Sequence, residues 1–174
     1  MSASLKPMSH FGNNIYVRGK RGRLSYFKQI VAALNASTAE YVFFCEHDVL
    51  YHPTHFDYTP TDGKFCFNRN VVKWRYPEPH FLSVDNCEQV SGMCAKREVA
   101  LKWYEDKLKK LENGEWDGHY EPQHNREHWH SSYPNVDIRH NKNITKNRWS
   151  PEEFRNKKYT EGWTESNCVA GWEL

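Results

Sequence analysis

The spacing of hydrophobic and polar residues along the chain predicts two helices. Apolar residues recur every three or four positions over residues 25–35 and again over residues 96–113, which is the period of an amphipathic α-helix. Gly114 follows the second segment, where a glycine commonly ends a helix. Both segments would bury one face and leave their charged face in solvent.

A different pattern marks residues 41–45, where five apolar residues follow one another without alternation. Such a run is typical of a strand that is buried on both faces, as in a parallel sheet under helices. A helix, a short loop and an apolar strand in this order make half of a β-α-β unit. We therefore expect an α/β fold with a mostly parallel central sheet flanked by helices, in a single domain over residues 1–174.

Shorter apolar segments indicate the remaining elements. They predict strands over residues 15–17, 64–74, 87–93 and 136–140. Residues 1–14, 49–60, 115–135 and 163–174 are expected to be loops or to carry no clear element.

Composition narrows the class of protein. Hydrophobic residues make up 38% of the chain and aromatic residues 15%, so the core must rely on aromatic rings. The net charge of +2 is too small to argue for nucleic acid by itself. Five cysteines without a close CxxC pair argue against a disulfide scaffold or a thiolate zinc site. Since no signal peptide or membrane span is visible, we expect reduced thiols and a cytoplasmic location.

The apolar run at residues 41–45 stops at Glu46-His47-Asp48. If the strand geometry continues, the side chains of Glu46 and Asp48 point the same way and offer two oxygen donors to one cation. Mg²⁺ or Mn²⁺ suits such a pair, because these ions bind few carboxylates and keep positions for substrate phosphates. Open α/β sheets bind ligands at the carboxyl ends of their strands, so we interpret this stretch as a metal and phosphate site.

A basic loop precedes the first predicted helix. Residues 18–23, Arg-Gly-Lys-Arg-Gly-Arg, place four cations and two glycines in six positions. One interpretation is a flexible loop in which Arg18, Lys20 and Arg21 bind a diphosphate or another polyanion. The other interpretation is a solvated basic turn.

The acidic triplet and its surroundings resemble a known family. The run Glu-Tyr-Val-Phe-Phe-Cys-Glu-His-Asp over residues 40–48 is similar to the acid-x-acid strand end of GT-A nucleotide-sugar glycosyltransferases, particularly the family-2-like group. A bacterial and viral branch of that group is similar over residues 46–57, 70–74, 89–94 and 134–140. The likeness covers about residues 15–155. It implies a GT-A-like fold in reduced form, since only 45 residues precede Glu46.

The resemblance implies a metal-dependent glycosyltransferase. The donor would be a nucleotide diphosphate sugar, with a UDP-sugar favoured, and the cofactor Mn²⁺ or Mg²⁺. Asp48 would ligate the metal, Glu46 would contact the ribose or the metal, and His140 would complete the metal shell. The acceptor stays open, and only the basic loop permits a nucleic acid.

An inverting transferase also needs a general base within reach of the acceptor hydroxyl. Asp117, Glu121 and Asp137 are the candidates. Asp117 and Glu121 rank first because residues 116–121, Trp-Asp-Gly-His-Tyr-Glu, look like a site loop. A retaining enzyme would need no such base, and the sequence leaves the two cases open.

Two other functions compete with sugar transfer. A metal-dependent hydrolase or nuclease is one, since one loop is crowded with His47, His52, His55 and Asp57 and another with the histidines from His119 to His130. Pro53 opposes the helical spacing of a zinc protease. The other is a non-catalytic relic of a transferase that binds a glycan or a partner.

Overall fold

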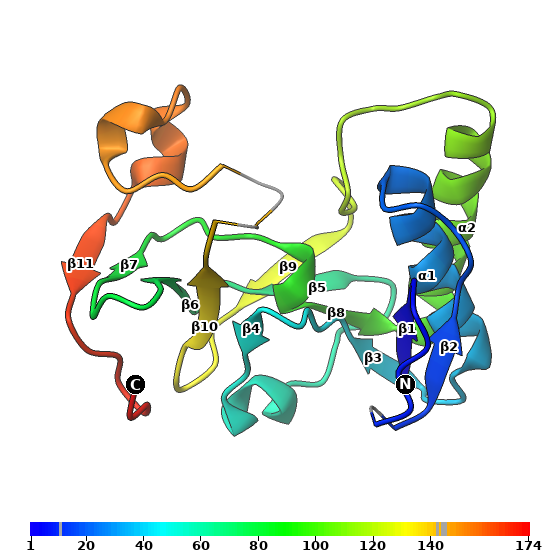
Figure 1. The fold of residues 1–174 in the computed structure, drawn as a ribbon, viewed down its shortest axis with the longest axis horizontal. Helices are drawn as coiled ribbons and strands as arrows, with labels where there is room; N and C mark the ends of the chain where they lie inside the picture. Colours follow the sequence, from blue (N-terminus) through cyan, green and yellow to red (C-terminus); the bar gives the residue numbers. More distant parts are fainter. Residues whose placement is uncertain (11, 142, 144–145) are drawn as a thin grey trace. The chain divides into compact units, whose positions relative to one another are not determined.

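The computed structural model describes residues 1–10, 12–141, 143 and 146–174. Its helices and strands are labelled in Figure 1. The chain divides into two compact units, and each is described by itself. Unit 1 comprises Met1–Val42, Thr61–Phe65 and Ala95–Asn125, and unit 2 comprises Phe43–Pro60, Cys66–Cys94 and Arg126–Leu174.

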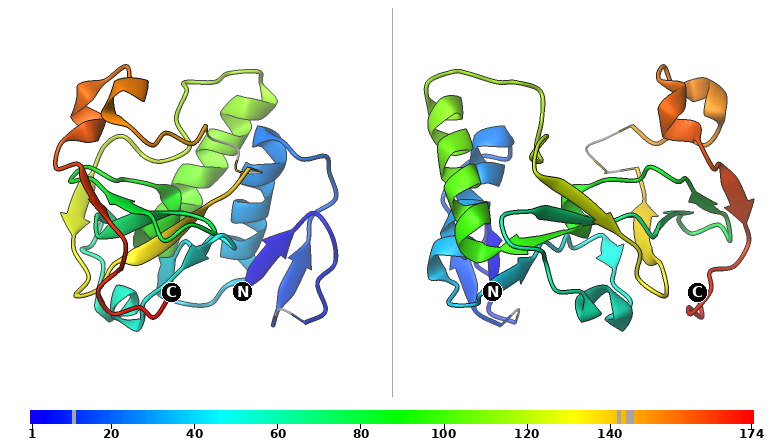
Figure 2. Two further views of the ribbon diagram at one scale, coloured as in Figure 1. Left: turned by 60° about the vertical axis from the view of Figure 1, so that its left-hand side comes forward. Right: turned by 180° about the vertical axis from the view of Figure 1, so that it is seen from behind.

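Unit 1 is built on the two predicted helices, α1 (Arg23–Ala36) and α2 (Arg97–Glu112), which pack side by side. The helices are confirmed, and their ends lie within two residues of the predicted ones. The strands β1 (Ser2–Ser4) and β2 (Asn14–Tyr16) form a two-stranded parallel sheet beside them (Figure 2). Gly114 adopts φ +83°, the left-handed conformation that favours glycine after a helix.

Aromatic rings make up much of the core of unit 1, as the composition predicts. Phe27 and Tyr104 are fully buried, and their ring centroids lie 5.8 Å apart. The rings of Trp116 and Tyr120 lie 6.2 and 6.0 Å from Phe27. These contacts join α1 and α2 to the segment that follows α2.

Unit 2 contains a five-stranded sheet in the order β11-β7-β6-β10-β4. The strands are β4 (Val49–Leu50), β6 (Val71–Arg75), β7 (Phe81–Ser83), β10 (Asn135–Arg139) and β11 (Thr164–Ser166). Strand β10 pairs parallel with β6 and antiparallel with β4, so Val136 lies opposite both Val72 and Leu50. The pairs β6–β7 and β7–β11 are antiparallel.

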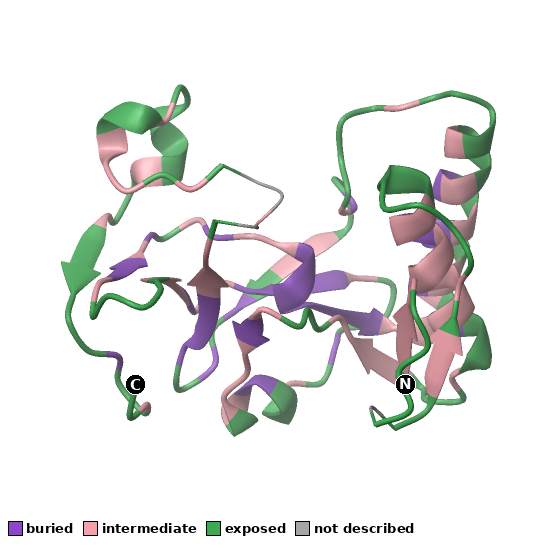
Figure 3. Cartoon of the chain, in the orientation of Figure 1, coloured by how far each residue is buried: buried purple, intermediate pink, exposed green. Residues whose placement is uncertain are grey.

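A second sheet has the order β3-β8-β5-β9. Its strands are β3 (Tyr41–Phe43), β5 (Phe65–Asn68), β8 (Met93–Lys96) and β9 (Arg126–Trp129). All of β5 and most of β8 are buried (Figure 3). In unit 2, Cys66, Cys94 and Trp129 form a cluster against Phe43 and Tyr58.

The prediction of a mostly parallel sheet flanked by helices, in the GT-A manner, is wrong. Only one of the four pairings in the five-stranded sheet is parallel. The strand expected to be buried on both faces, β3, is three residues long and half-buried. Its side chain Phe43 packs in a local aromatic cluster instead, since the ring of Phe43 lies 5.3 Å from the rings of both His55 and Phe56.

Other expected elements are confirmed or shifted. The strands expected over residues 15–17 and 136–140 are β2 and β10. The strand expected over residues 64–74 is split into β5 and β6, because the Asn68 side chain accepts a hydrogen bond from Asn70 N (2.9 Å) and turns the chain. In the strand expected over residues 87–93, residues Val90–Gly92 form a 3₁₀ turn, and the observed strand β8 begins only at Met93. The segments expected to be loops contain β1, β4, β9 and β11.

The two units are interleaved along the chain. Their six segments alternate, so the chain passes between the units five times and neither unit is one continuous stretch. The single domain expected from the sequence therefore stays a prediction. Within the described residues, no helix combines the length and the apolar character needed to cross a membrane.

Candidate functional site

Glu46, His47 and Asp48, which we call the acidic edge, lie in the turn between β3 and β4 of unit 2. A hydrogen bond from Val49 N to Glu46 O (3.4 Å) closes this turn, and Glu46 N donates to Tyr51 Oη (2.9 Å). Strand β4 then pairs antiparallel with β10. The acidic edge is thus fixed at one end of the five-stranded sheet.

The segment that follows β10 meets the acidic edge. Asp48 O accepts a hydrogen bond from Ile138 N (2.8 Å), and Asp48 Oδ2 accepts one from Asn143 Nδ2 (3.0 Å), 95 positions along the chain. Asn143 Oδ1 in turn accepts from the main-chain N of His140 (2.5 Å). The structure therefore joins Asp48 to the backbone of His140 through Asn143, whereas the predicted metal ligand was the imidazole ring of His140.

Asp137 adds a third carboxylate to this region. Its residue is only 5% exposed, and Lys73 lies opposite it on the neighbouring strand β6. Arg139 Nη1 lies 3.5 Å from Asp137 Oδ2. The pKa of Asp137 is raised, chiefly by burial; Arg139 and Lys73 oppose this rise, whereas the charge of Asp48 adds to it.

The charges of these carboxylates also affect Glu46. As a residue Glu46 is exposed, but protein atoms crowd its carboxyl group. Its pKa is raised, first by this desolvation and then by the negative charges of Asp48 and Asp137. His47 and Arg139 lower it by smaller amounts. Glu46, Asp48 and Asp137 therefore act on one another electrostatically, with Arg139 close by.

The carboxylates of Glu46 and Asp48 suit a divalent cation whose remaining ligands are phosphate oxygens. Among the described residues, no group of three or more His, Cys, Asp or Glu side chains could hold a metal ion by itself. Mg²⁺ and Mn²⁺ commonly bind through one or two carboxylates and complete their shell with water and substrate phosphates. Desolvation is the first cause of the raised pKa of Glu46, and a cation beside Glu46 and Asp48 would offset the second cause, the negative charges nearby.

Lys73 and Arg139 were not predicted as site residues. Arg139 is two positions from Asp137 on a strand, so the alternation of side chains could have placed the two on one face. No local pattern could have identified Lys73, because its register opposite Asp137 is set by the pairing of β6 with β10.

The predicted phosphate ligands and the two base candidates that ranked first belong to unit 1, whereas the third base candidate, Asp137, belongs to unit 2. Arg18, Lys20 and Arg21 are exposed residues of unit 1. Asp117 and Glu121 also belong to unit 1, whereas the acidic edge belongs to unit 2. Their assigned roles stay predictions.

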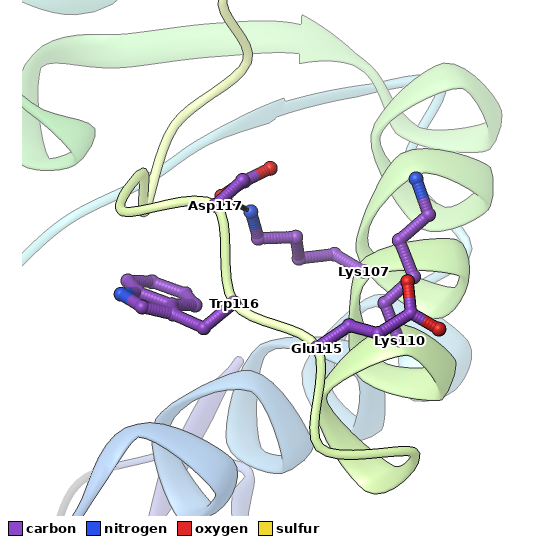
Figure 4. Close-up of a pocket in the computed structure, with 5 residues that line it drawn as sticks. All are labelled: Lys107, Lys110, Glu115, Trp116 and Asp117. Atoms are coloured by element: carbon purple, nitrogen blue, oxygen red, sulfur yellow. Dashed lines mark hydrogen bonds and ion pairs between the residues drawn. The ribbon is translucent and has the colours of Figure 1, made fainter.

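Asp117 has a partner of its own within unit 1. Its carboxylate forms an ion pair with Lys107 and accepts a hydrogen bond from His119 N (3.1 Å). Figure 4 shows this ion pair, which lines a shallow depression in unit 1. The hydrogen bond from Lys107 is the main reason that the pKa of Asp117 is lowered. A lowered pKa makes this carboxylate a weaker proton acceptor.

Two of the histidines that motivated a hydrolase, His52 and His55, have other partners. His55 is fully buried, and its Nδ1 lies 3.0 Å from Asn68 Nδ2 and 3.1 Å from Asn135 Nδ2. His52 Nδ1 lies 2.9 Å from Thr54 Oγ1. These two rings hold the 3₁₀ helix Pro53–Asp57 and the core together instead of forming a metal centre.

A group of charged residues around Glu88 was also missed. The Glu88 carboxylate forms ion pairs with Arg69 and Arg126, and its Oε1 lies 2.6 Å from His128 Nε2. The partners come from the turn before β6 and from β9, so no local sequence pattern points to them. The group links three segments of unit 2.

The site of unit 2 thus combines two kinds of charge. Glu46, Asp48 and Asp137 supply carboxylates that suit a cation, and Lys73 and Arg139 supply positive charges that suit phosphate oxygens. Compared with known proteins, the chain matches no family model, no curated protein and no solved structure.

Proposed function

We propose that unit 2 binds a divalent cation together with a nucleotide diphosphate sugar at the acidic edge, and that the chain transfers the sugar to an acceptor. One observation carries this proposal: Asp48 is hydrogen-bonded both to the end of β10, through Ile138, and to Asn143 beyond it. This contact joins the acidic edge to the segment that contains His140.

The residues of the site have separate tasks in this proposal. Glu46 and Asp48 hold the cation, and Asn143 orients the Asp48 carboxylate by donating to its Oδ2. Lys73 and Arg139 offset the negative charge of a diphosphate. The bound Mn²⁺ or Mg²⁺ would neutralise the diphosphate as it leaves the sugar.

Sugar transfer is preferred to phosphoester hydrolysis for two reasons. The first reason is that residues 40–57 resemble those of nucleotide-sugar transferases. Among nucleotide sugars, we favour a UDP-sugar as the donor. Two of the histidines that would favour a zinc hydrolase are engaged elsewhere, since His55 lies in the core and His52 contacts Thr54. The proposal does not depend on Asp117 or Glu121 as general base, because a retaining transferase needs none.

Replacing Asp48 tests the proposal. In Asp48→Asn the side chain can still accept the Asn143 hydrogen bond but loses its charge. We expect Mn²⁺-dependent binding of UDP, measured by isothermal titration calorimetry, to weaken at least about tenfold, the equivalent of 1.4 kcal/mol. The matched control is Asp57→Asn, an exposed carboxylate at the end of the 3₁₀ helix Pro53–Asp57, which should bind as the unaltered chain does.

The outcomes separate the competing functions. Unchanged UDP binding in Asp48→Asn, or no Mn²⁺-dependent binding by the unaltered chain, would contradict the site. If UDP-sugars bind but are neither hydrolysed nor used with any acceptor in a screen for released UDP, the chain is a binding relic and the enzymatic part of the proposal is wrong. Phosphodiesterase activity with tightly bound zinc would favour the hydrolase instead.

A further inference from the structure

The charge of the chain is unevenly divided between its units. Unit 1 carries 13 Lys and Arg against 9 Asp and Glu, whereas unit 2 carries 11 against 13. The first 39 residues contain six cations and no carboxylate: Lys6, Arg18, Lys20, Arg21, Arg23 and Lys28. The small net charge of +2 therefore conceals a basic unit 1.

The cations of the basic loop are exposed to solvent. Arg18, Lys20, Arg21 and Arg23 are all classed as exposed, and within the described part of the chain none of them forms an ion pair. Lys28, by contrast, pairs with Glu112 at 3.1 Å. The loop thus presents four uncompensated positive charges within six residues.

Aromatic side chains continue this basic surface. The Arg23 guanidinium lies 4.8 Å from the centroid of the Trp116 ring, and Lys107 Nζ lies 4.7 Å from the same centroid. The ring of Tyr120 lies 5.1 Å from that of Trp116 and 5.4 Å from that of Tyr26. Tyr120 is 36% exposed, so the aromatic group that begins at Arg23 reaches solvent.

A shallow depression adjoins this group and is drawn in Figure 4. Its volume is about 220 Å³, and it is lined by Lys107, Lys110, Glu115, Trp116 and Asp117. Pockets for whole small molecules usually start at about 300 Å³. The depression therefore suits one group of a longer ligand better than a complete small molecule.

We propose that this face of unit 1, defined by Arg18, Lys20, Arg21, Arg23, Trp116 and Tyr120, binds single-stranded nucleic acid. Lysine and arginine side chains would contact the phosphates, and the exposed ring of Tyr120, which packs beside the half-buried Trp116, would stack on an unpaired base. An anionic lipid surface would satisfy the cations but offers no bases to the rings. All these residues belong to unit 1, so the inference is independent of the site proposed in unit 2.

Binding of a fluorescein-labelled 12-nucleotide single strand to the full chain, followed by fluorescence anisotropy, tests this inference. We expect saturable binding at low salt that weakens as salt rises. In Arg18→Glu/Lys20→Glu/Arg21→Glu we expect a loss of at least about tenfold, and a slope of log affinity against log salt that is shallower by about 2, since each phosphate contact on a single strand contributes about 0.7. Tyr120→Leu should weaken binding about fivefold by removing a stacking ring.

A control variant carries the same change of charge elsewhere. Arg155, Lys157 and Lys158 form a second exposed basic segment, in unit 2. Their triple replacement by Glu should leave the affinity within about twofold, apart from a small general effect of net charge. Circular dichroism of each variant would establish that it is folded.

Several results would overturn the inference. The first two are the absence of saturable binding at low salt and an equal loss of affinity in the control variant. The third is equally tight binding of an abasic strand of the same length. The fourth is tighter binding of phosphatidylserine vesicles than of the oligonucleotide. None of these results affects Mn²⁺-dependent binding of UDP, so the two proposals fail separately.

Discussion

At the scale of single residues, His55 anchors the loop that follows the acidic edge. Its Nδ1 faces the amide groups of Asn68 and Asn135, which donate to it, so the ring is neutral and carries its proton on Nε2. The ring stacks on Trp129 at 5.4 Å. The next residue, Phe56, is 47% exposed, so the ring of His55 is the more deeply buried of the two.

This arrangement makes stability depend on pH. Burial lowers the pKa of His55 from 6.5 to about 4 in the folded chain. Between these values the unfolded chain binds the proton more readily, so the stabilisation is complete above about pH 6.5 and is lost as the pH falls toward 4. We expect the free energy of unfolding to fall by about 3 kcal/mol over this range because of His55 alone.

Urea unfolding of the unaltered chain and of His55→Gln at several pH values measures this effect. Glutamine keeps an oxygen that can accept from the two asparagines but does not titrate. The variant should be less stable at pH 7, and the part of the pH dependence that belongs to His55 should disappear. Parallel curves of stability against pH for the two proteins would show that His55 does not contribute.

At the scale of elements, Glu88 joins β9 to the turn before β6. Its carboxylate is the shared partner of Arg69 and Arg126, whose side chains are each 23% exposed. Glu88→Gln would leave two largely buried guanidinium groups without a counter-charge. We expect a loss of about 2–3 kcal/mol in the free energy of unfolding, somewhat less than for a fully buried pair.

Glu165→Gln is the matched control for Glu88→Gln. Glu165 pairs with His80 at 2.8 Å, but its side chain is 48% exposed. Its replacement should change the free energy of unfolding by about 0.5 kcal/mol or less. Equal effects of the two variants in urea unfolding would refute the role given to Glu88.

The elements also show what the sequence could predict. Both helices were predicted because the spacing of Phe27 and Leu34 in α1, and of Ala100 and Tyr104 in α2, is a local signal. Strand pairing is not local: Asn135 lies opposite Val71 through a contact that no short pattern encodes. The apolar run at residues 41–45 led to a wrong prediction for the same reason. Whether such a run is buried on both faces depends on the fold around it.

The residues of the candidate site also differ in whether a local sequence pattern points to them. Glu46 and Asp48 were proposed as site residues because they are two positions apart at the end of an apolar run, and that role stays a prediction. Lys73 and Asn143 were missed because they meet Asp137 and Asp48 only through the pairing of β10 with β6 and β4. A local pattern could thus single out the carboxylates as candidates, whereas the residues that lie near them are set by strand pairing.

At the scale of the whole molecule, the two units share strands. The chain passes between them five times, and β3, β5 and β8 each contribute residues to both. If one unit unfolded alone, each of these strands would lose part of its length. We therefore expect the chain to unfold in a single cooperative step, although it divides into two units.

Phe27→Leu in unit 1 tests this cooperativity. Phe27 is fully buried between the helices, so the smaller side chain should lower the stability of unit 1 by about 1–2 kcal/mol. In native-state hydrogen exchange, the slowest amides report global unfolding. With one cooperative step, the slowest amides of β6 and β10 in unit 2 should lose as much protection as those of α1 and α2. If protection falls only in the helices, the units unfold separately.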